Sequence, residues 1–241
     1  MRKISPRLLA VSEEIEKRGF QDIVYDIGTD HAYLPIHLLQ SGICGAVAVS
    51  DISYRSLDRA KRNVAAGGVA GGVRFYAGDG FLSIPDYIPG RIVIIAGIGG
   101  INLINILKKG ADKARAASLL VLQPMSGQEE LREWLYNNTF AIEYERLARE
   151  GNRVYNILFC RAADAQEPYA PADVYIGNRV AYVSREDYIF FLRFTRKKIS
   201  NRLNGLNAAK TACRGIGANT VAEINRLAGV VYEIDKRITE V

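Results

Sequence analysis

The sequence has few of the residues that bind metals or form disulfides. Its 241 residues include three cysteines, Cys44, Cys160 and Cys213, which are far apart and odd in number, so neither a disulfide framework nor a zinc cluster is expected. The two histidines, His31 and His37, could add a weak metal pair at most. We therefore predict a protein without a metal centre.

Long apolar runs are also missing. No stretch of about 18 apolar residues is present to cross a bilayer, and residues 1–6 contain no apolar signal core. Apolar residues make up 49% of the chain and charged residues 24%, a composition typical of a soluble globular protein. The expectation is a cytoplasmic protein with no membrane partner. The formal net charge of +6 favours a polyanionic partner, but many basic proteins merely have solvated lysines, so the distribution of the charge matters more than its sum.

Apolar strands alternate with helices through most of the chain. Strands are expected at 22–26, 45–50, 73–77, 91–96 and 118–123, and helices at 5–18, 33–41, 54–66, 100–109 and 127–138. Strands that are apolar throughout and separated by helices indicate a parallel sheet covered on both faces. The runs 140–147 and 153–160 have no helix between them and predict an antiparallel hairpin. A doubly wound α/β sheet that ends in such a hairpin is typical of the Rossmann-like class I methyltransferases.

The composition changes in the last third of the chain. Residues 162–173 are small, polar and proline-bearing, as in a linker. From Ser184, a capping residue, apolar residues follow heptad spacing, with Arg196 in the one polar position. The expected seam residues are Ile189, Leu192, Ile199, Leu203 and Leu206, followed by Val221, Ile224, Ala228, Val231 and Ile238. The sequence thus predicts two domains, 1–161 and 162–241, the second an antiparallel helical hairpin that forms a short coiled coil.

One segment joins an apolar strand to a helix through an acid and a glycine. It spans 23–35 and reads Ile-Val-Tyr-Asp-Ile-Gly-Thr-Asp-His-Ala-Tyr-Leu-Pro, an arrangement that brings a backbone turn close to a nucleotide-like ligand at the carboxyl end of a strand. Gly28 has no side chain to block a ligand, while Asp26 and Asp30 supply acceptors but no positive charge. A binding site lined by these acids suits S-adenosylmethionine, which carries positive charge and no phosphate, better than it suits a pyrophosphate. An ordinary strand-to-helix turn is the alternative for this stretch alone.

Acidic or glycine-rich residues also end the next three predicted strands. Asp51 stands where an acid commonly accepts hydrogen bonds from ribose hydroxyls. Asp79, within Gly-Asp-Gly at 78–80, can accept from an adenine amino group, and Ala-Gly-Ile-Gly-Gly at 96–100 leaves the backbone bare. Each of these three strand ends also has a purely structural explanation, either a tight turn or close packing of a helix. Together with the first strand end they predict a nucleoside-type cofactor site.

Five segments of the chain together point to a known family. They are Asp-Ile-Gly-Thr-Asp-His-Ala-Tyr-Leu-Pro (26–35), Gly-Asp-Gly (78–80), Ile-Ala-Gly-Ile-Gly-Gly (95–100), Leu-Gln-Pro (122–124) and Arg-Val-Tyr-Asn-Ile (153–157). These segments closely resemble the bacterial tRNA adenine-N1 methyltransferases that modify adenine 22 in the D-arm. The resemblance covers roughly residues 4–161 and extends more loosely to the helical tail. It departs at Asp51, Ile98 and Asn156, where the family usually has glutamate, methionine and an acid.

The resemblance implies S-adenosylmethionine as cofactor and tRNA as partner. The expected cofactor-binding residues are Asp26, Gly28, His31, Asp51, Asp79, Gly80, Gly97, Ile98, Gly99 and Gly100. The chain lacks the Asp/Asn-Pro-Pro-aromatic tetrad with which enzymes that methylate exocyclic amines hold the amino nitrogen. A ring nitrogen is therefore the expected target.

The chemistry can be argued from the base itself. Adenine N1 has a free lone pair that attacks the sulfonium methyl in line, so positioning and charge stabilisation are the main catalytic tasks. Asp30 is the candidate carboxylate that favours the developing positive charge, and a helix N-cap is its alternative role. Tyr155 is the second candidate catalytic residue, because with His31 and Tyr33 it could stack on or hydrogen-bond the flipped adenine. A tyrosine in a strand is also often a core residue.

Acidic residues are absent between Tyr188 and Ala222, where seven basic residues occur. They are Arg193, Arg196, Lys197, Lys198, Arg202, Lys210 and Arg214. Helical spacing places Arg193, Lys197 and Lys210 away from the seam, where they could contact phosphates. The predicted RNA-binding set is Arg193, Lys197, Lys198, Arg202 and Lys210, which Arg2, Lys3 and Arg7 could extend. A dimerising coiled coil with basic flanks is the alternative, and we expect a monomer or a weak homodimer.

The leading prediction is an enzyme that transfers a methyl group from S-adenosylmethionine to N1 of an adenine in tRNA. A methyltransferase that acts on another RNA or on a small molecule is the alternative enzyme, and the basic tail disfavours it. A non-catalytic RNA-binding module is disfavoured by the four acids at the strand ends. A nicotinamide oxidoreductase is disfavoured because residues 26–31 lack the three-glycine phosphate turn.

Overall fold

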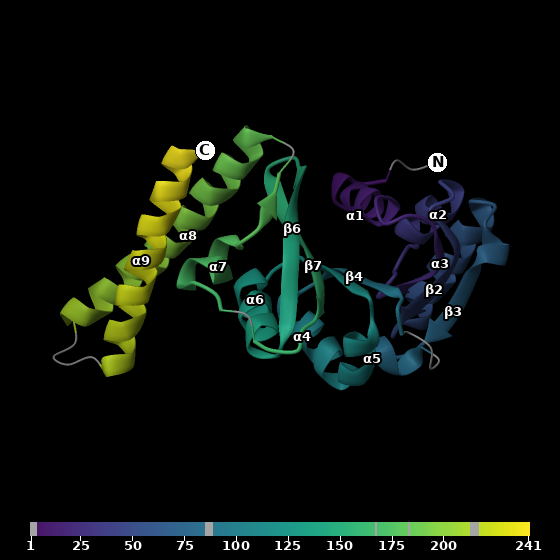
Figure 1. Cartoon of the computed structure of the whole chain (residues 1–241), viewed down its shortest axis with the longest axis horizontal. Helices are drawn as coiled ribbons and strands as arrows, with labels where there is room; N and C mark the ends of the chain where they lie inside the picture. The colour runs from purple at the N-terminus through teal and green to yellow at the C-terminus, as the bar shows by residue number, and fades with distance from the viewer. Residues whose placement is uncertain (1–3, 85–88, 167, 183, 213–216) are drawn as a thin grey trace.

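A computed structural model describes residues 4–84, 89–166, 168–182, 184–212 and 217–241. Figure 1 shows a sheet with helices packed on it and, at one end of the molecule, the long helices α8 and α9 side by side. Among the sequence expectations, those on Arg2, Lys3, Cys213 and Arg214 lie outside the described residues.

The described residues form an eight-stranded sheet with the order β3-β2-β1-β4-β5-β7-β6-β8. The strands are β1 (Gln21–Ile27), β2 (Cys44–Asp51), β3 (Val73–Ala77), β4 (Ile92–Ile98), β5 (Leu119–Pro124), β6 (Phe140–Glu150), β7 (Arg153–Ala162) and β8 (Val180–Ala181). The first five run parallel, and β7 pairs antiparallel with both β5 and β6. The doubly wound sheet with a terminal antiparallel hairpin is therefore confirmed. Because the strand order reverses between β1 and β4, the crevice beyond their carboxyl ends is the expected ligand position.

Two groups of helices cover the two faces of the sheet. The helices of this part are α1 (Pro6–Glu16), α2 (Tyr33–Gln40), α3 (Tyr54–Ala66), α4 (Gly100–Lys109), α5 (Ala111–Ala116) and α6 (Gln128–Asn137). One core cluster joins α1, α2 and α3 to Val24 and Ile94, and the other joins α4, α5 and α6 to Val93 and Ile95. Neighbouring strand residues point to opposite faces, so apolar runs such as 92–95 supply both cores.

A second set of helices follows the hairpin. They are α7 (Pro171–Ile176), α8 (Arg185–Ala212) and α9 (Ala218–Glu240). The expectation of a linker over 162–173 is wrong in its last part, because α7 begins at Pro171 and packs against α6 and α9. The Asp173 carboxylate accepts a hydrogen bond from the Ala170 amide at 2.8 Å and stabilises the start of α7. Beyond α7, β8 adds a short parallel strand to β6, so the sheet includes residues beyond 161.

The packing of α8 and α9 follows the predicted seam only in part. Ser184 caps α8, since its hydroxyl accepts from the Asp187 amide at 3.0 Å, and Arg196 pairs with Asp235 of α9. On α9 the buried residues are Ile224, Leu227, Val230 and Ile234, whereas the predicted seam residues Val221 and Ala228 are exposed. The reason is that α9 packs against α7 as well as α8, so its apolar stripe is turned toward both.

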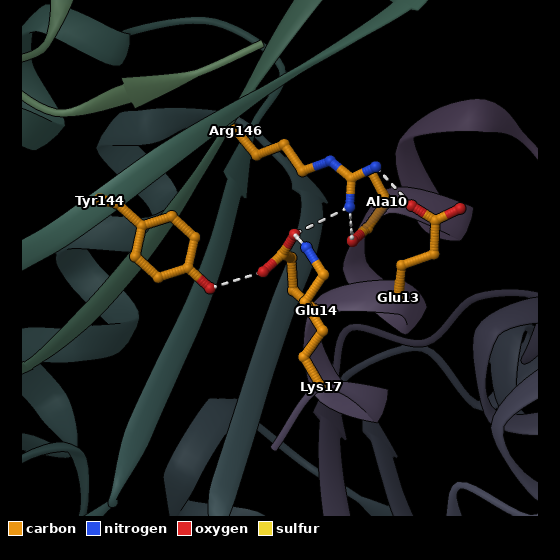
Figure 2. A network of polar contacts seen from close by, with 6 residues as sticks. All are labelled: Ala10, Glu13, Glu14, Lys17, Tyr144 and Arg146. Atoms are coloured by element: carbon orange, nitrogen blue, oxygen red, sulfur yellow. Dashed lines mark hydrogen bonds and ion pairs between the residues drawn. The ribbon is translucent and has the colours of Figure 1, made fainter. Parts of the chain in front are cut away.

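A polar network attaches α1 to the hairpin. The Glu14 carboxylate lies between α1 and β6 and accepts hydrogen bonds from the Tyr144 hydroxyl at 2.8 Å and the Arg146 guanidinium at 2.9 Å, as Figure 2 shows. Burial raises the pKa of Glu14, but Lys17, Tyr144 and Arg146 outweigh this and hold it below its ordinary value. The network fixes α1, and with it Arg7 in the first turn of α1, above the end of the sheet.

A buried ion pair connects the sheet to α7. Arg132 of α6 donates two hydrogen bonds of 2.7 Å to the Glu145 carboxylate of β6, and both side chains are almost completely buried. Arg132 also donates to the Val174 carbonyl of α7 at 3.0 Å. Asn156 of β7 donates to the same carboxylate at 3.2 Å. Four elements thus share one buried charge pair.

Candidate functional site

The chain turns sharply at the carboxyl end of β1. Gly28 has φ +78°, a conformation that side chains disfavour, and a Cβ there would lie 2.7 Å from Ile98 Cδ1. The Gly28 amide donates to the Ser50 carbonyl of β2 at 2.7 Å, which holds the turn against the neighbouring strand. Asp26 is only 5% exposed, and its carboxylate accepts from the Thr29 hydroxyl.

Asp26 is a buried acid with a perturbed ionisation. Burial raises the pKa of its carboxyl to about 6, against the hydrogen bond from Thr29, and the nearby Asp51 adds to the increase. A buried acid of this kind, at the switch point of a parallel sheet, marks a site that suits a cation.

Asp30 and its neighbours form the outer lip of the turn. Asp30 and Ala32 have φ +31° and +55°, which is uncommon for residues other than glycine and marks a strained, specifically shaped loop. The Asp30 carboxylate pairs with Arg59 and lies 3.4 Å from His31 Nε2. The first residue before α2 is Ala32, not Asp30, so the helix-cap role considered for Asp30 is wrong. His31 stacks on Tyr33, with ring centroids 5.1 Å apart.

Asp51 stands beside this turn at the end of β2. One of its oxygens accepts from the Ser53 amide at 2.7 Å, and the other lies 3.4 Å from the Asp30 amide. Asp79 follows β3 and pairs with Lys109 of α4. Gly80 has φ +57° and packs against Ile106, where a Cβ would lie 2.9 Å from Ile106 Cγ2. Packing against α4 therefore explains Gly80 without a ligand.

The glycine-rich segment 97–100 runs from the end of β4 into the start of α4, and its glycines have two different roles. Gly97 has φ +79°, and its amide donates to Gln123 Oε1 at 3.1 Å. Gly99 is the residue before α4, and a Cβ on Gly100 would lie 2.1 Å from the Gly127 carbonyl oxygen. Gly100 thus allows α4 to approach the loop after β5, and only the start of the segment faces the strand ends.

A cavity of about 170 Å³ lies at the ends of β1 and β4. The predicted residues that line it are Asp26, Gly28, Asp30, His31 and Gly97. The predicted residues outside its lining are Asp51, Asp79, Gly80, Ile98, Gly99, Gly100 and Tyr155. Ligand pockets usually measure about 300–1,000 Å³, so this cavity has room for part of a nucleoside ligand, with the rest over the ends of β2 and β3.

Arg7 adds a positive charge to this cavity. The prediction of a binding site with acidic groups but no positive charge is therefore wrong. Arg7 Nη1 donates to Gln123 Oε1 at 2.7 Å, and its guanidinium lies 5.7 Å from the centre of the Tyr155 ring. Its Nε is buried without a hydrogen bond and lies 3.5 Å from Glu150 Oε1, an ion-pair distance. The sequence pattern instead assigns Arg7 to an RNA-binding surface. Nothing local in the sequence indicates this position, because Gln123 and Tyr155 are more than a hundred residues away along the chain.

Tyr155 lines a second, larger cavity of about 600 Å³. This cavity lies between α8 on one side and the start of β7 with the β5–α6 loop on the other, and we call it the interdomain cavity. Tyr155 itself is buried, as the core alternative predicted. The structure therefore does not place the two candidate catalytic residues, Asp30 and Tyr155, in one cavity.

The predicted RNA-binding residues divide into two groups. Arg193, Lys197 and Lys210 are exposed on α8, and none has a hydrogen-bond or ion-pair partner among the described residues. Lys198 pairs with Glu129 at 2.6 Å, and Arg202 pairs with Glu223. The first group is therefore available for phosphates without breaking an existing contact.

Among the described residues, no group of three or more His, Cys, Asp or Glu side chains is arranged to hold a metal ion. Within the same residues, no helix combines the length and apolar character needed to cross a membrane. Cys44 and Cys160 are buried free thiols.

A doubly wound sheet with an antiparallel terminal hairpin and an acidic, glycine-lined cavity at its switch point defines a Rossmann-like methyltransferase. A methyltransferase domain family matches residues 4–158. The chain belongs more narrowly to the family of the tRNA (adenine(22)-N(1))-methyltransferases. It is 32% identical over 193 residues to the Bacillus subtilis (strain 168) protein of that name. This match covers 79% of each of the two chains.

Solved structures of similar proteins agree with this assignment. The chain is 26% identical to a Streptococcus pneumoniae protein described as a candidate tRNA (m1A22) methyltransferase in complex with S-adenosyl-L-methionine, with a TM-score of 0.75 over 95% of this chain and 100% of that one. It is 25% identical to the B. subtilis m1A22 tRNA methyltransferase, with a TM-score of 0.72 over 99% of each chain. Both likenesses include the α8–α9 part.

Proposed function

We propose that the protein transfers a methyl group from S-adenosylmethionine to N1 of an adenine in tRNA, at position 22 of the D-arm. The observation that carries this proposal is the charge pattern of the cavity at the ends of β1 and β4, whose lining includes both the buried acid Asp26 and the guanidinium of Arg7. S-adenosylmethionine is a sulfonium zwitterion with an ammonium group and a carboxylate. Asp26 suits its cationic groups, and the guanidinium suits its carboxylate.

The remaining strand ends fit the nucleoside half of this cofactor. Asp51 keeps lone pairs beyond its 2.7 Å hydrogen bond from Ser53, and these can accept from ribose hydroxyls. Asp79 is half-buried and engaged by Lys109 in a partly exposed pair, which is easily exchanged for an adenine amino group. Gly28 and Gly97 line the same cavity, and neither contributes a side chain that would narrow it.

The chain's own residues have two tasks in the reaction. The bound cofactor supplies the electrophilic methyl group, so the protein must hold adenine N1 in line with it and stabilise the charge that the base acquires. Asp30 lines the cavity and pairs with Arg59, and we assign its carboxylate the task of favouring the positive charge that the base acquires. His31 and Tyr33 form a stacked aromatic pair beside Asp30 that can support the flipped base.

The helical part supplies affinity for the RNA. We propose residues 1–161 as the methyltransferase domain, to whose sheet β8 is added, and 162–241 as the tRNA-binding domain, in which α8 and α9 act as a short antiparallel coiled coil. Arg193, Lys197 and Lys210 contact phosphates first, and Lys198 and Arg202 join them by exchanging their partners. The protein acts in the cytoplasm as a monomer or a weak homodimer.

The test is methylation of a defined RNA by the purified protein. A tRNA transcript with adenine at position 22 is incubated with methyl-labelled S-adenosylmethionine, digested to nucleosides and analysed by mass spectrometry. We expect one 1-methyladenosine per molecule, and none in a transcript with guanine at position 22. Product at another position, methylation of the exocyclic amine, or no product on either RNA would contradict the proposal.

A further inference from the structure

The proposed reaction does not use the interdomain cavity. Its volume of about 600 Å³ is in the usual range of ligand pockets, about 300–1,000 Å³. One wall is a face of α8 that carries Phe190, Phe191 and Phe194, and the facing wall carries Tyr155 and Met125. Phe194 is 63% exposed, which is a high fraction for a phenylalanine at the edge of an aromatic cavity.

The charge around this cavity is positive. Arg153 lines it, is exposed and has no side-chain partner among the described residues. Lys198 lines it too, and its partner Glu129 is the one acidic side chain in the lining. On α8, Phe194 directly follows Arg193, and Lys197 is three residues further on. Aromatic faces interleaved with unpaired cations are the pattern of surfaces that stack single-stranded nucleic-acid bases and hold their phosphates.

The cavity is separated from the cofactor end of the sheet. Arg7 lines the smaller cavity, Tyr155 lines the interdomain cavity, and the Arg7 guanidinium lies over the Tyr155 ring at 5.7 Å. The hydrogen bond from Arg7 to Gln123, at 2.7 Å, holds this partition in place. A base in the interdomain cavity thus has the Arg7–Tyr155 contact between it and the cavity that Asp26 and Gly28 line.

We propose that the interdomain cavity binds a second, unpaired base of the same tRNA, stacked on Phe194, while the target adenine occupies the site at Asp30. This inference rests on the proposed function, because it requires an RNA substrate. The cavity then positions the tRNA and contributes to specificity. A tRNA binds well only if a nucleotide near the target adenine can unstack from its neighbours and enter the cavity. Arg153 and Lys197 then hold the phosphates on either side of that base.

The first test separates binding from chemistry in the full-length protein. Phe194→Ala removes the exposed ring, and Tyr232→Ala, which removes a ring that is 72% exposed on α9 and outside the cavity lining, is the matched control. Stacking of a base on an aromatic ring is typically worth a factor of about ten or more in affinity. We expect Phe194→Ala to raise the tRNA Kd at least tenfold, with the single-turnover rate at saturating tRNA within about twofold of wild type.

Further variants keep this test independent of folding. Phe194→Tyr should bind tRNA like the wild type, because it restores the ring, and Arg153→Ala should weaken binding in the same direction as Phe194→Ala. S-adenosylmethionine affinity should be unchanged in all of them. Wild-type tRNA affinity in Phe194→Ala would overturn the proposal. So would a large loss of the saturating rate at constant tRNA Kd, since the cavity would then hold the reacting base.

The second test locates the base. Transcripts with 2-aminopurine at single positions of the D-arm and its loop are titrated with protein, and quenching at one position other than the target is expected with the wild type and not with Phe194→Ala. Quenching that is the same in both proteins would overturn the stacking on Phe194. If the wild type methylates no tRNA, the proposed function fails, whereas methylation with unaltered Phe194→Ala binding refutes only the second-base site.

Discussion

At the scale of single residues, Asp26 links cofactor binding to pH. Its pKa is raised to about 6 in the folded protein by burial, so a cationic ligand binds the ionised form more tightly. With one coupled proton, the Kd of S-adenosylmethionine should be about tenfold higher at pH 5 than at pH 7. Titration calorimetry across this range measures the change. A flat profile would mean that Asp26 does not face the cofactor's positive charge.

Asp26 also makes the stability of the folded protein depend on pH. Because the folded state holds the Asp26 proton more tightly than the unfolded chain, this group stabilises the fold below pH about 4, and the contribution is lost as pH rises through about 6. Asp26→Asn carries no such proton and is the matched control. It should remove the pH dependence of cofactor affinity over this range and bind weakly throughout.

Asp30 is expected to be the residue on which methyl transfer most depends. Asp30→Asn preserves size and removes the charge that faces a base becoming cationic, and loss of one such contact costs about a hundredfold to a thousandfold in turnover. The Asp30 side chain is 50% exposed and pairs with Arg59, so the fold should tolerate the change. Single-turnover kinetics should show tRNA and cofactor affinities within about threefold of wild type. A rate within about threefold of wild type would remove Asp30 from the catalytic role.

The residues at the strand ends could be predicted because of a property of parallel sheets. Their carboxyl ends meet at one edge, so acids and glycines that follow successive strands are brought together wherever they stand in the sequence. Asp26, Gly28 and Gly97 share a cavity for this reason. The position of Arg7 depends on how α1 packs on the hairpin, through contacts such as the 2.8 Å Tyr144–Glu14 hydrogen bond that no local pattern indicates.

At the scale of elements, the bounds of α3 and β3 follow from sequence because strong patterns delimit them. Helix 54–66 and strand 73–77 have the predicted bounds. The seam predicted for α9 is wrong at Val221 and Ala228 because heptad spacing assumes a single partner helix. Helix α9 packs on α7 as well as on α8, so a different set of residues is buried. A six-residue helix such as α7 lacks the length to show periodicity, and its burial depends on Arg132, which donates to the Val174 carbonyl at 3.0 Å.

The Arg132–Glu145 pair should be the most sensitive junction between these elements. Arg132→Met leaves a carboxylate buried without its partner and removes the hydrogen bond to α7, a type of change that costs about 3–5 kcal/mol of unfolding free energy. Arg161→Met, which breaks a partly exposed pair with Glu143, should cost about 0–1 kcal/mol. Urea unfolding of the two variants measures the difference. Equal destabilisation would show that the buried pair contributes no more than a surface one.

At the scale of the whole molecule, acidic and basic groups are divided between the sheet and α8. Asp26 and Asp30 line the cavity at the strand ends, and unpaired cations lie on α8, which forms one wall of the interdomain cavity. Figure 1 shows α8 and α9 extending beyond the sheet, and the exposed residues Arg193, Lys197 and Lys210 are distributed along α8 and form its open face. Because α8 also forms one wall of the interdomain cavity, an RNA on this face would lie beside that cavity, an arrangement that the separate sequence patterns of the two parts do not predict.

The open face of α8 should carry most of the salt-dependent tRNA affinity. Arg193, Lys197 and Lys210, when all changed to Glu, lose three phosphate contacts, so the tRNA Kd should rise strongly and the slope of log Kd against log salt should flatten by about three. A control that changes Arg62, Arg74 and Lys108 to Glu brings the formal net charge from +6 to zero in the same way, at exposed positions away from α8. Affinity and salt slope, measured from about 50 to 200 mM salt, should change much less in the control, and S-adenosylmethionine binding should be unaltered in both variants.

If the two variants lose tRNA affinity equally, the attraction comes from the overall charge of the protein and α8 is not the docking face. Wild-type affinity in the α8 variant would instead assign its basic residues to another partner, such as a second copy of the chain.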